Sequence, residues 1–201
     1  MSGKLYFKYG CMNSGKSLML LSQAHSLDEQ GVSVLCMKPS ADTRDGDGVI
    51  KSRVGIAKEC VMIEDDLNVF SYLEDLFVNY TLHAIDTPRW IIIDECQFLQ
   101  PEQVEQIAEF VDKYGVNVMC YGIRTDFTGH LFPGSKRLME LSDCIEEIKM
   151  SCGCGRKATM NARFDVNGNI ITEGDVVAIG GNSMYRALCR KCYNSLVFAA
   201  K

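Results

Sequence analysis

The feature that most constrains this chain is the segment Gly10–Ser17, whose spacing is G-x-x-x-x-G-K-S. In such a P-loop the glycines let backbone amides curl around a polyphosphate, the lysine reaches the outer phosphates, and the serine hydroxyl can ligate Mg²⁺. The flanks support the motif, because residues 4–9 are typical of a strand and residues 16–30 have helical apolar spacing that Gly31 ends. A strand, a glycine loop and a helix N-terminus together present amides and a helix dipole to an anion. An ordinary glycine turn before a helix is the less favoured interpretation.

We therefore expect a nucleotide to contact the whole loop. Its residues are Gly10, Cys11, Met12, Asn13, Ser14, Gly15, Lys16 and Ser17.

The length and net charge of the chain limit the classes of protein to which it can belong. The chain has 201 residues, 47% of them apolar, which suffices for one full core and a small appendage. Its net charge of −5 makes it a poor candidate for tight, non-specific nucleic-acid binding, which depends on clustered Lys and Arg. It has neither an apolar run of about 18 residues nor a signal-peptide core at its start. We expect a cytoplasmic protein that has no nucleic-acid partner and no contact with a membrane.

Strand-like and helix-like segments alternate over residues 1–150, which predicts an α/β fold with a doubly wound parallel sheet. Residues 90–94 are expected to form a strand whose first four residues are all apolar, as in a strand that is covered on both faces. Residues 42–58, rich in glycine and charge, indicate a mobile loop without regular structure. The other expected strands are 4–9, 32–38, 116–121 and 144–150, and the expected helices are 16–30, 67–80, 101–115 and a short one within 129–141.

The pattern changes at Ser151. Residues 158–164 and 170–179 are short β segments around the turn signal Asn167-Gly168. We expect two domains, a nucleotide-binding domain at 1–150 and a small β-rich domain at 151–201.

Two carboxylates, Asp94 and Glu95, follow the apolar strand. The carboxyl end of a buried parallel strand lies at the edge where such sheets bind ligands. Asp94 is then placed to hold Mg²⁺ through water, and Glu95 is free to accept a proton from a nucleophile. The alternative is that both residues merely begin a solvated loop.

Four of the ten cysteines form two close pairs, Cys152-x-Cys154 and Cys189-x-x-Cys192. In a reducing compartment four thiolates from two turns favour a structural zinc site, which would supply folding free energy to a domain with little core. Free buried thiols or a redox pair are the alternatives. Cys36, Cys96 and Cys120 lie in or beside apolar runs and are most simply buried small hydrophobes.

Together these motifs resemble the type II thymidine kinases, the cytosolic and bacterial kind, over nearly the whole chain. The likeness depends on several motifs in order: residues 10–17, Asp42-Thr43-Arg44, 94–98, 121–127, the four cysteines, and Gly180-Gly181 followed by Tyr185. The chain departs from many members in its Cys-x-Cys first pair, where they have Cys-x-x-Cys.

The resemblance implies a P-loop (RecA-like) fold and transfer of the γ-phosphate of ATP to the 5′-hydroxyl of thymidine, with deoxyuridine left open. It implies that Glu95 is the general base, that Lys16 and Ser17 contact phosphate and Mg²⁺, and that Gln97 belongs to the nucleotide site. It also implies a homotetramer and feedback inhibition by thymidine triphosphate. The implied substrate residues are Met12, Asp42, Arg44, Phe98, Ile123, Phe127, Phe132 and Tyr185, with Val176, Val177, Ala178, Ile179 and Gly180 forming a lasso loop whose backbone holds the base.

Two other functions fit parts of the sequence. One is an ATPase whose zinc module binds nucleic acid, although the acidic charge, the missing second motor domain and the lack of a basic stripe argue against it. The other is a regulatory protein that binds a nucleotide without turning it over.

Overall fold

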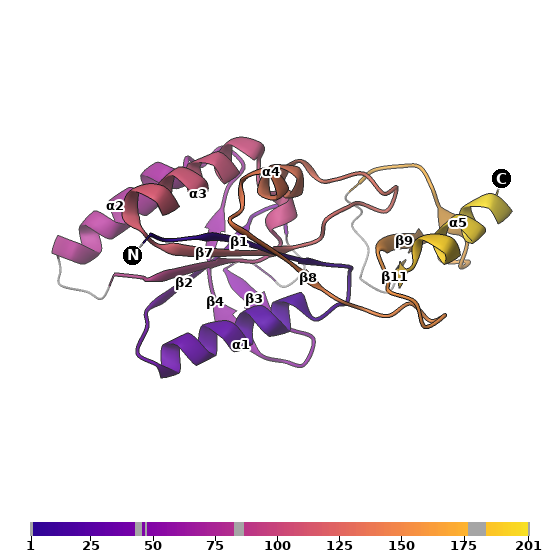
Figure 1. The fold of residues 1–201 in the computed structure, drawn as a ribbon, viewed down its shortest axis with the longest axis horizontal. Coiled ribbons are helices and arrows are strands. Elements are labelled where there is room, and N and C mark those ends of the chain that lie inside the picture. Colours follow the sequence, from indigo (N-terminus) through magenta and orange to yellow (C-terminus); the bar gives the residue numbers. More distant parts are fainter. Residues whose placement is uncertain (1, 43–45, 47, 83–86, 177–183, 201) are drawn as a thin grey trace.

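The computed structural model describes residues 2–42, 46, 48–82, 87–176 and 184–200. Its main element is a six-stranded sheet with the strand order β5-β2-β6-β7-β1-β8, in which every pairing is parallel (Figure 1). The strands are β1 (Leu5–Gly10), β2 (Val34–Pro39), β5 (Val61–Ile63), β6 (Trp90–Ile93), β7 (Asn117–Gly122) and β8 (Cys144–Ile148).

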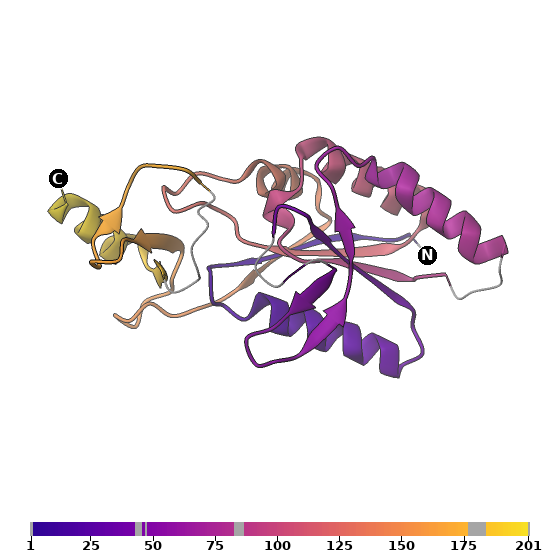
Figure 2. The same cartoon turned by 180° about the vertical axis from the view of Figure 1, so that it is seen from behind.

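Helices cover both faces of this sheet (Figures 1 and 2). Helix α1 (Lys16–Glu29) lies on one face, and α2 (Val69–Leu82), α3 (Pro101–Tyr114) and α4 (Pro133–Leu141) lie on the other. Strand β6 shows why its sequence is uniformly apolar: Ile91 and Ile93 pack into the core under α2 and α3, whereas Ile92 packs into the core under α1. The doubly wound α/β prediction is confirmed.

The predicted ends of α3 are also confirmed. Pro101 is the first helical residue, where its missing N–H costs nothing, and Gly115 ends the helix with a left-handed φ of 67°. The Gln103 amide donates to the carbonyls of Glu64 and Leu67, so α3 also holds the segment that leads into α2.

The expectation of an irregular loop over residues 42–58 is wrong for its second half. Residues Val49–Lys51 (β3) and Ala57–Glu59 (β4) form an antiparallel hairpin, and β5 joins the edge of the main sheet directly afterwards. Ile50 of β3 is buried in the core under α1, which anchors the hairpin on that face. Three-residue strands carry too few side chains for a two-residue period to be visible in the sequence.

The C-terminal residues form a separate, smaller unit. A three-stranded antiparallel sheet has the order β10 (Ile170–Ile171), β9 (Met160–Phe164) and β11 (Tyr185–Leu188). The predicted turn between β9 and β10 is present, since the Asp165 carboxylate accepts from the backbone amides of Asn167 and Asn169.

Two expectations for this region need correction. The strand expected at 170–179 ends at Ile171, and residues 177–179 lie outside the described part of the chain. A helix, α5 (Arg190–Ala199), begins directly after Cys189, whereas the β-rich expectation for residues 151–201 includes no helix there. Cys189 caps this helix and Cys192 lies in its first turn, so the metal-site spacing and the start of the helical pattern occupy the same residues. The domain boundary at residue 151 stays a prediction.

Within the described part of the chain, no helix combines the length and apolar character that crossing a membrane requires.

Candidate active site

The phosphate-binding motif forms a tight loop between β1 and α1. Asn13 and Gly15 have left-handed φ values of 68° and 82°, so the backbone reverses sharply before the helix begins at Lys16. A Cβ atom added to Gly10 would overlap the Ser14 hydroxyl and the Ile148 carbonyl oxygen. The motif therefore needs glycine at position 10 for space and at position 15 for its conformation.

Lys16 bends back over this loop. Its side chain is buried, and its Nζ atom donates to the Cys11 carbonyl oxygen at 3.0 Å. A buried ammonium above a ring of backbone amides is the environment that a polyphosphate needs.

Asp94 lies at the carboxyl edge of the sheet, directly after β6. Its backbone N–H donates to the Met37 carbonyl of β2 at 3.0 Å. The Ser17 hydroxyl lies near enough to the Asp94 carboxylate to lower its pKa, so the end of β6 lies beside the start of α1. Burial, then the nearby charge of Glu95, raises the Asp94 pKa to about 7, against opposing effects of Ser17, the Glu95 amide and Lys16. A hydroxyl and a carboxylate in contact are hard oxygen donors that suit Mg²⁺.

Glu95 is held in an unusual conformation. Its φ of 48° is left-handed, which a non-glycine residue adopts at a cost of about 1 kcal/mol or more. Its carboxylate accepts a hydrogen bond from the Gln97 side-chain amide at 2.5 Å. The Gln97 carbonyl oxygen accepts from the Ile123 backbone N–H at 3.0 Å, so one buried side chain connects Glu95 to the segment after β7.

Gly122, the last residue of β7, makes this bridge possible. A Cβ there would lie 2.6 Å from both the Cys96 sulfur and the Gln97 side-chain oxygen. The expectation that Gln97 contacts the nucleotide stays a prediction, since the described partners of its side chain are Glu95 and Ile123.

Three of the predicted substrate residues, Phe98, Phe132 and Ile123, are connected to the segment that contains Glu95. Phe98 follows it in a short 3₁₀ helix (Cys96–Phe98) and packs edge-on against Phe132, with ring centroids 5.9 Å apart. Ile123 and Phe127 are buried, and the Ile123 carbonyl accepts from the Ser135 hydroxyl at the start of α4.

The remaining predicted substrate residues are spread more widely. Asp42 is buried beside the equally buried Lys38, with Nζ and Oδ2 3.7 Å apart. Tyr185 pairs with Arg163 across β11 and β9, and the Arg163 guanidinium lies 5.2 Å from the centre of the Phe127 ring. Val176 is exposed. The other predicted residues, Arg44, Val177, Ala178, Ile179 and Gly180, lie outside the described part of the chain.

The four predicted metal ligands come together. The sulfur atoms of Cys152, Cys154, Cys189 and Cys192 all lie within 4.8 Å of one another, and those of Cys154 and Cys189 are 3.6 Å apart. A tetrahedral zinc site with bonds of about 2.3 Å places its sulfurs about 3.8 Å apart, so these residues fit the ion. Backbone amides of Cys154 and Cys189 lower the pKa of the Cys152 thiol to about 6, which favours the thiolate that binds metal.

The Cys-x-Cys pair fits this geometry because its turn is tight. The amide of Gly155 donates to the Cys152 carbonyl, with Gly155 at a left-handed φ of 83°. The Cys189 sulfur accepts from the Cys192 amide at the start of α5, so the second pair is held by a helix N-terminus. The three other cysteines expected to be small core residues, Cys36, Cys96 and Cys120, are buried.

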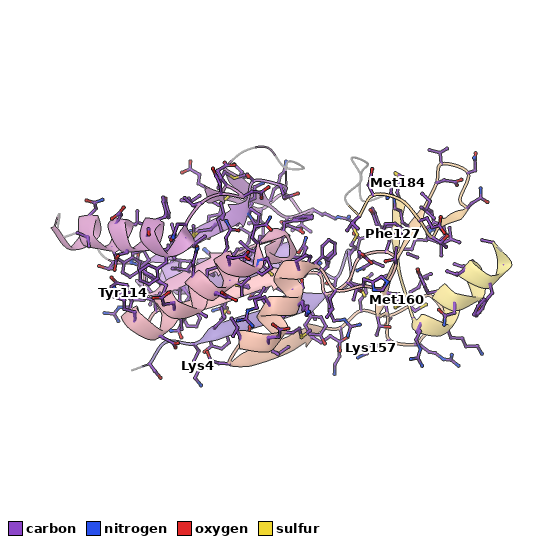
Figure 3. The ribbon with its side chains drawn as sticks, turned by 90° about the horizontal axis from the view of Figure 1, so that it is seen from above. Lys4, Tyr114, Phe127, Lys157, Met160 and Met184 are labelled. Atoms are coloured by element: carbon purple, nitrogen blue, oxygen red, sulfur yellow. The ribbon has the colours of Figure 1, made fainter. Side chains whose placement is uncertain are left out.

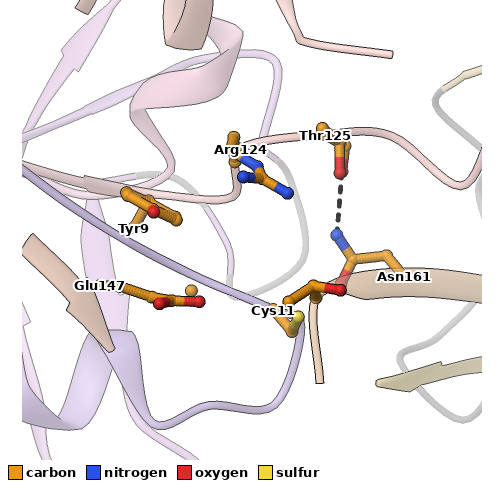
Figure 4. Close-up of a pocket in the computed structure, with 8 residues that line it drawn as sticks. Tyr9, Cys11, Arg124, Thr125, Glu147 and Asn161 are labelled. Atoms are coloured by element: carbon orange, nitrogen blue, oxygen red, sulfur yellow. Dashed lines mark hydrogen bonds between the residues drawn. The ribbon is translucent and has the colours of Figure 1, made fainter. Parts of the chain in front are cut away.

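Sequence reasoning missed one residue at this site, Asn161 of β9. Its side-chain oxygen accepts from the Met12 backbone N–H in the phosphate loop at 2.8 Å, and its side-chain nitrogen donates to the Thr125 carbonyl at 2.9 Å (Figure 4). The only signal in the sequence was a polar residue within a short strand.

The C-terminal unit makes a second contact of this kind. The Tyr193 hydroxyl of α5 donates to the Phe127 carbonyl at 2.7 Å. Phe127, in the segment after β7, is consequently attached to the C-terminal unit, and Figure 3 labels it on that side of the molecule.

This geometry defines a class before it defines a family. The P-loop serine lies beside a carboxylate at the carboxyl edge of a parallel sheet, and a second carboxylate follows directly. This combination is typical of P-loop proteins that transfer phosphoryl groups. The profile of the thymidine kinase family matches residues 3–193. The chain belongs to the thymidine kinase family, which is a family of transferase enzymes.

Relatives from bacteria and a phage are similar over almost the whole length. The thymidine kinase of Streptococcus agalactiae serotype Ia is 46% identical over 191 residues, which cover 94% of this chain and 96% of that protein. The thymidine kinase of Vibrio cholerae is 45% identical over 190 residues, with the same coverage of both chains. The thymidine kinase of Enterobacteria phage T4 is 44% identical over 192 residues, which cover 96% of each.

Among solved structures, the crystal structure of Pif1 helicase from Candida albicans matches 73% of this chain and 36% of that chain. Its TM-score is 0.42 at 16% sequence identity, so this likeness carries no argument about the protein.

Proposed function

We propose that this protein is a thymidine kinase, which transfers the γ-phosphoryl group of ATP to the 5′-hydroxyl of thymidine. One observation carries the proposal: the Glu95 carboxylate, fixed by Gln97, directly follows the carboxylate that contacts Ser17 of the phosphate loop. This arrangement supports the proposal that a proton acceptor and a phosphate site lie side by side at the edge of one sheet. The names of the relatives supply the substrate.

Glu95 acts as the general base in this proposal. As the 5′-oxygen approaches the γ-phosphorus, the hydroxyl proton passes to the Glu95 carboxylate. The hydrogen bond from Gln97 and the left-handed backbone of Glu95 together restrict where the carboxylate points. A base that its neighbours already hold in position meets the condition for effective placement.

Lys16 and the loop amides hold the phosphates and offset the charge that develops on them. In this structure the Lys16 ammonium is directed at the Cys11 carbonyl, from which it can turn to phosphate oxygens without leaving the loop. Ser17 and Asp94 would hold Mg²⁺, which when bound neutralises negative charge on the transferred group. Asp42 and Arg44 are proposed to complete this side of the site.

The nucleoside is proposed to lie against Phe98, Ile123, Phe127 and Phe132, covered by the lasso loop that the family resemblance predicts for residues 176–180. The edge-on Phe98 and Phe132 rings offer apolar area for a base or sugar beside the proton acceptor. Backbone hydrogen bonds from the loop would select thymine, because a mismatched base leaves buried polar groups unpaired.

Zinc has a structural role in this proposal. All four ligand positions are taken by protein sulfurs, which leaves none open for a reacting group. The homotetramer, inhibition by thymidine triphosphate and a cytoplasmic location belong to the proposal as well.

A screen of nucleosides as phosphate acceptors tests the proposal most directly. Purified protein is incubated with ATP, Mg²⁺ and each nucleoside in turn, and monophosphate and zinc content are measured on the same sample. We expect thymidine to be phosphorylated, with deoxyuridine as the informative second acceptor. Hydrolysis of ATP without transfer to any nucleoside would reject the proposal and favour an ATPase.

A further inference from the structure

Asn161 joins three parts of the molecule through a single side chain. It lies on β9 of the C-terminal sheet, and only 3% of it is exposed. Its oxygen accepts from the Met12 backbone N–H in the phosphate loop. Its nitrogen donates to the Thr125 carbonyl beyond β7, the hydrogen bond that Figure 4 draws. Both halves of the amide are thus used, each by a backbone group of a different segment.

The segment that contains Thr125 is held by several hydrogen bonds of its own. The Asp126 carboxylate accepts from the backbone amides of Thr128 and His130 and from the Thr128 hydroxyl, which closes a tight turn. The Phe132 amide donates to the Arg124 carbonyl on the far side of that turn. Asn161 therefore connects the phosphate loop to a segment that is itself closed by hydrogen bonds.

The hydrogen bond to Met12 has a specific consequence. It uses one backbone amide at the beginning of the phosphate loop, before the left-handed turn at Asn13 and Gly15. The position of that turn, and of the amides that follow it, is then set by a residue outside the loop. Phe127, on the proposed nucleoside side, lies two residues from the carbonyl that receives the other half of the Asn161 amide.

We propose that Asn161 is a positioning residue for phosphoryl transfer, which holds the ATP side and the nucleoside side of the site at a fixed separation. The inference rests on the proposed function, since it assigns the two segments to the two substrates. Because a misplacement of about 1 Å can reduce a rate by about a hundredfold, the effect should appear mainly in turnover.

The test compares Asn161→Leu with Tyr193→Phe. Leucine has nearly the shape of asparagine but makes neither hydrogen bond. Tyr193→Phe is the matched control, because it removes a hydrogen bond from the same C-terminal unit to the neighbouring Phe127 carbonyl without touching the phosphate loop. For both variants the measurements are zinc per chain, Kd for a non-hydrolysable ATP analogue without nucleoside, and kcat per nucleotide-binding site.

We expect Asn161→Leu to lower kcat by about 10- to 100-fold and to raise the Kd of the ATP analogue by about 3-fold or more, with zinc retained. Tyr193→Phe should change both values by less than about 2-fold. If Asn161→Leu does not fold, Asn161→Asp replaces it, because aspartate keeps the acceptor for Met12 and loses the donor to Thr125; its kcat should then fall by about 10-fold.

A kcat within about 2-fold of wild type in the folded, zinc-loaded variant would overturn the inference, as would equal losses in the Asn161 and Tyr193 variants. Failure of the proposed function would look different, since the wild-type protein itself would then phosphorylate no nucleoside. In that case the Kd comparison alone decides whether Asn161 sets the phosphate loop, and an unchanged Kd would reject this role.

Discussion

Exchange of Gln97 for glutamate would test whether the bridge from Glu95 to Ile123 controls the general base. The substitution keeps the size of the side chain and the oxygen that accepts from the Ile123 N–H at 3.0 Å. It replaces only the donor, which lies 2.5 Å from the Glu95 carboxylate in the wild type. Two carboxyl groups at this distance cannot both be ionised, so they share one proton and the pKa of the pair rises.

The size of this effect follows from the distance. If side-chain rotation increases the separation to about 4 Å, two charges still repel by about 4 kcal/mol at an effective dielectric constant of about 20, equivalent to about 3 pKa units. Glu95 is half-buried, so water screens part of this repulsion, and we expect the pKa of the base to rise by about 1 to 2 units.

The assay is the single-turnover rate of phosphoryl transfer as a function of pH. A general base works in its deprotonated form, so a raised pKa lowers the rate below that pKa, and activity returns as the pH rises past it. We expect the acidic limb of the pH–rate profile to move to higher pH by about 1 to 2 units, which is the expected rise in the pKa of the base.

Gln97→Leu provides the contrast. It removes both hydrogen bonds, so the rate should fall at every pH without movement of the acidic limb. The Ile123 N–H also loses its side-chain acceptor, which should lower the free energy of unfolding by about 1–3 kcal/mol, measured by denaturant titration. An acidic limb that stays in place in Gln97→Glu would refute the reasoning, since Glu95 would then not be the base or would not be held by Gln97.

Three further predictions follow from the same site. Glu95→Gln should retain binding of an ATP analogue but lower kcat by about 100-fold or more. The control is Glu140→Gln, on the surface of α4, which should leave kcat unchanged. Equal rates for wild type and Glu95→Gln would show that Glu95 is not the general base. Gly10→Ala should raise the Kd for ATP by about 10-fold or more, because its Cβ overlaps backbone, and Gly153→Ala, with open space around it, is the control in the same titration. Removal of zinc by a chelator, or Cys189→Ser, should lower Tm and destroy turnover together, as followed by metal analysis and thermal denaturation; full activity without zinc would contradict a structural role for the ion.

The sequence was most informative where backbone requirements and side-chain chemistry coincide in one segment. Gly10 and Gly15 are needed for space and for conformation, and Lys16 and Ser17 supply the chemistry, so the whole loop could be recognised in eight consecutive residues. Strand β6 was recognisable for a related reason, since burial on both faces leaves it no polar position.

Short elements were predicted poorly. The hairpin of β3 and β4 has three residues in each strand and depends on Ile50 inserting under α1, a contact that no local period shows. Helix α5 begins at the second cysteine pair, where two patterns occupy the same residues, and the metal spacing is the more visible of the two. In both cases tertiary contacts, not local propensity, decide the structure.

The residues that connect the site could not have been found from spacing alone. Gln97 and the Ile123 amide are 26 positions apart, and Asn161 and the Met12 amide are 149 positions apart. In each pair one partner is a backbone group, so the partner's side chain gives no chemical signal of the contact. A motif identifies groups that act on a ligand, because the ligand fixes their type. A residue that holds such a group in place needs only a side chain long enough to form one hydrogen bond with it, and many residue types meet that requirement. The placement of Glu95 and of the phosphate loop therefore becomes visible only when strands β7 and β9 are brought to the same end of the sheet.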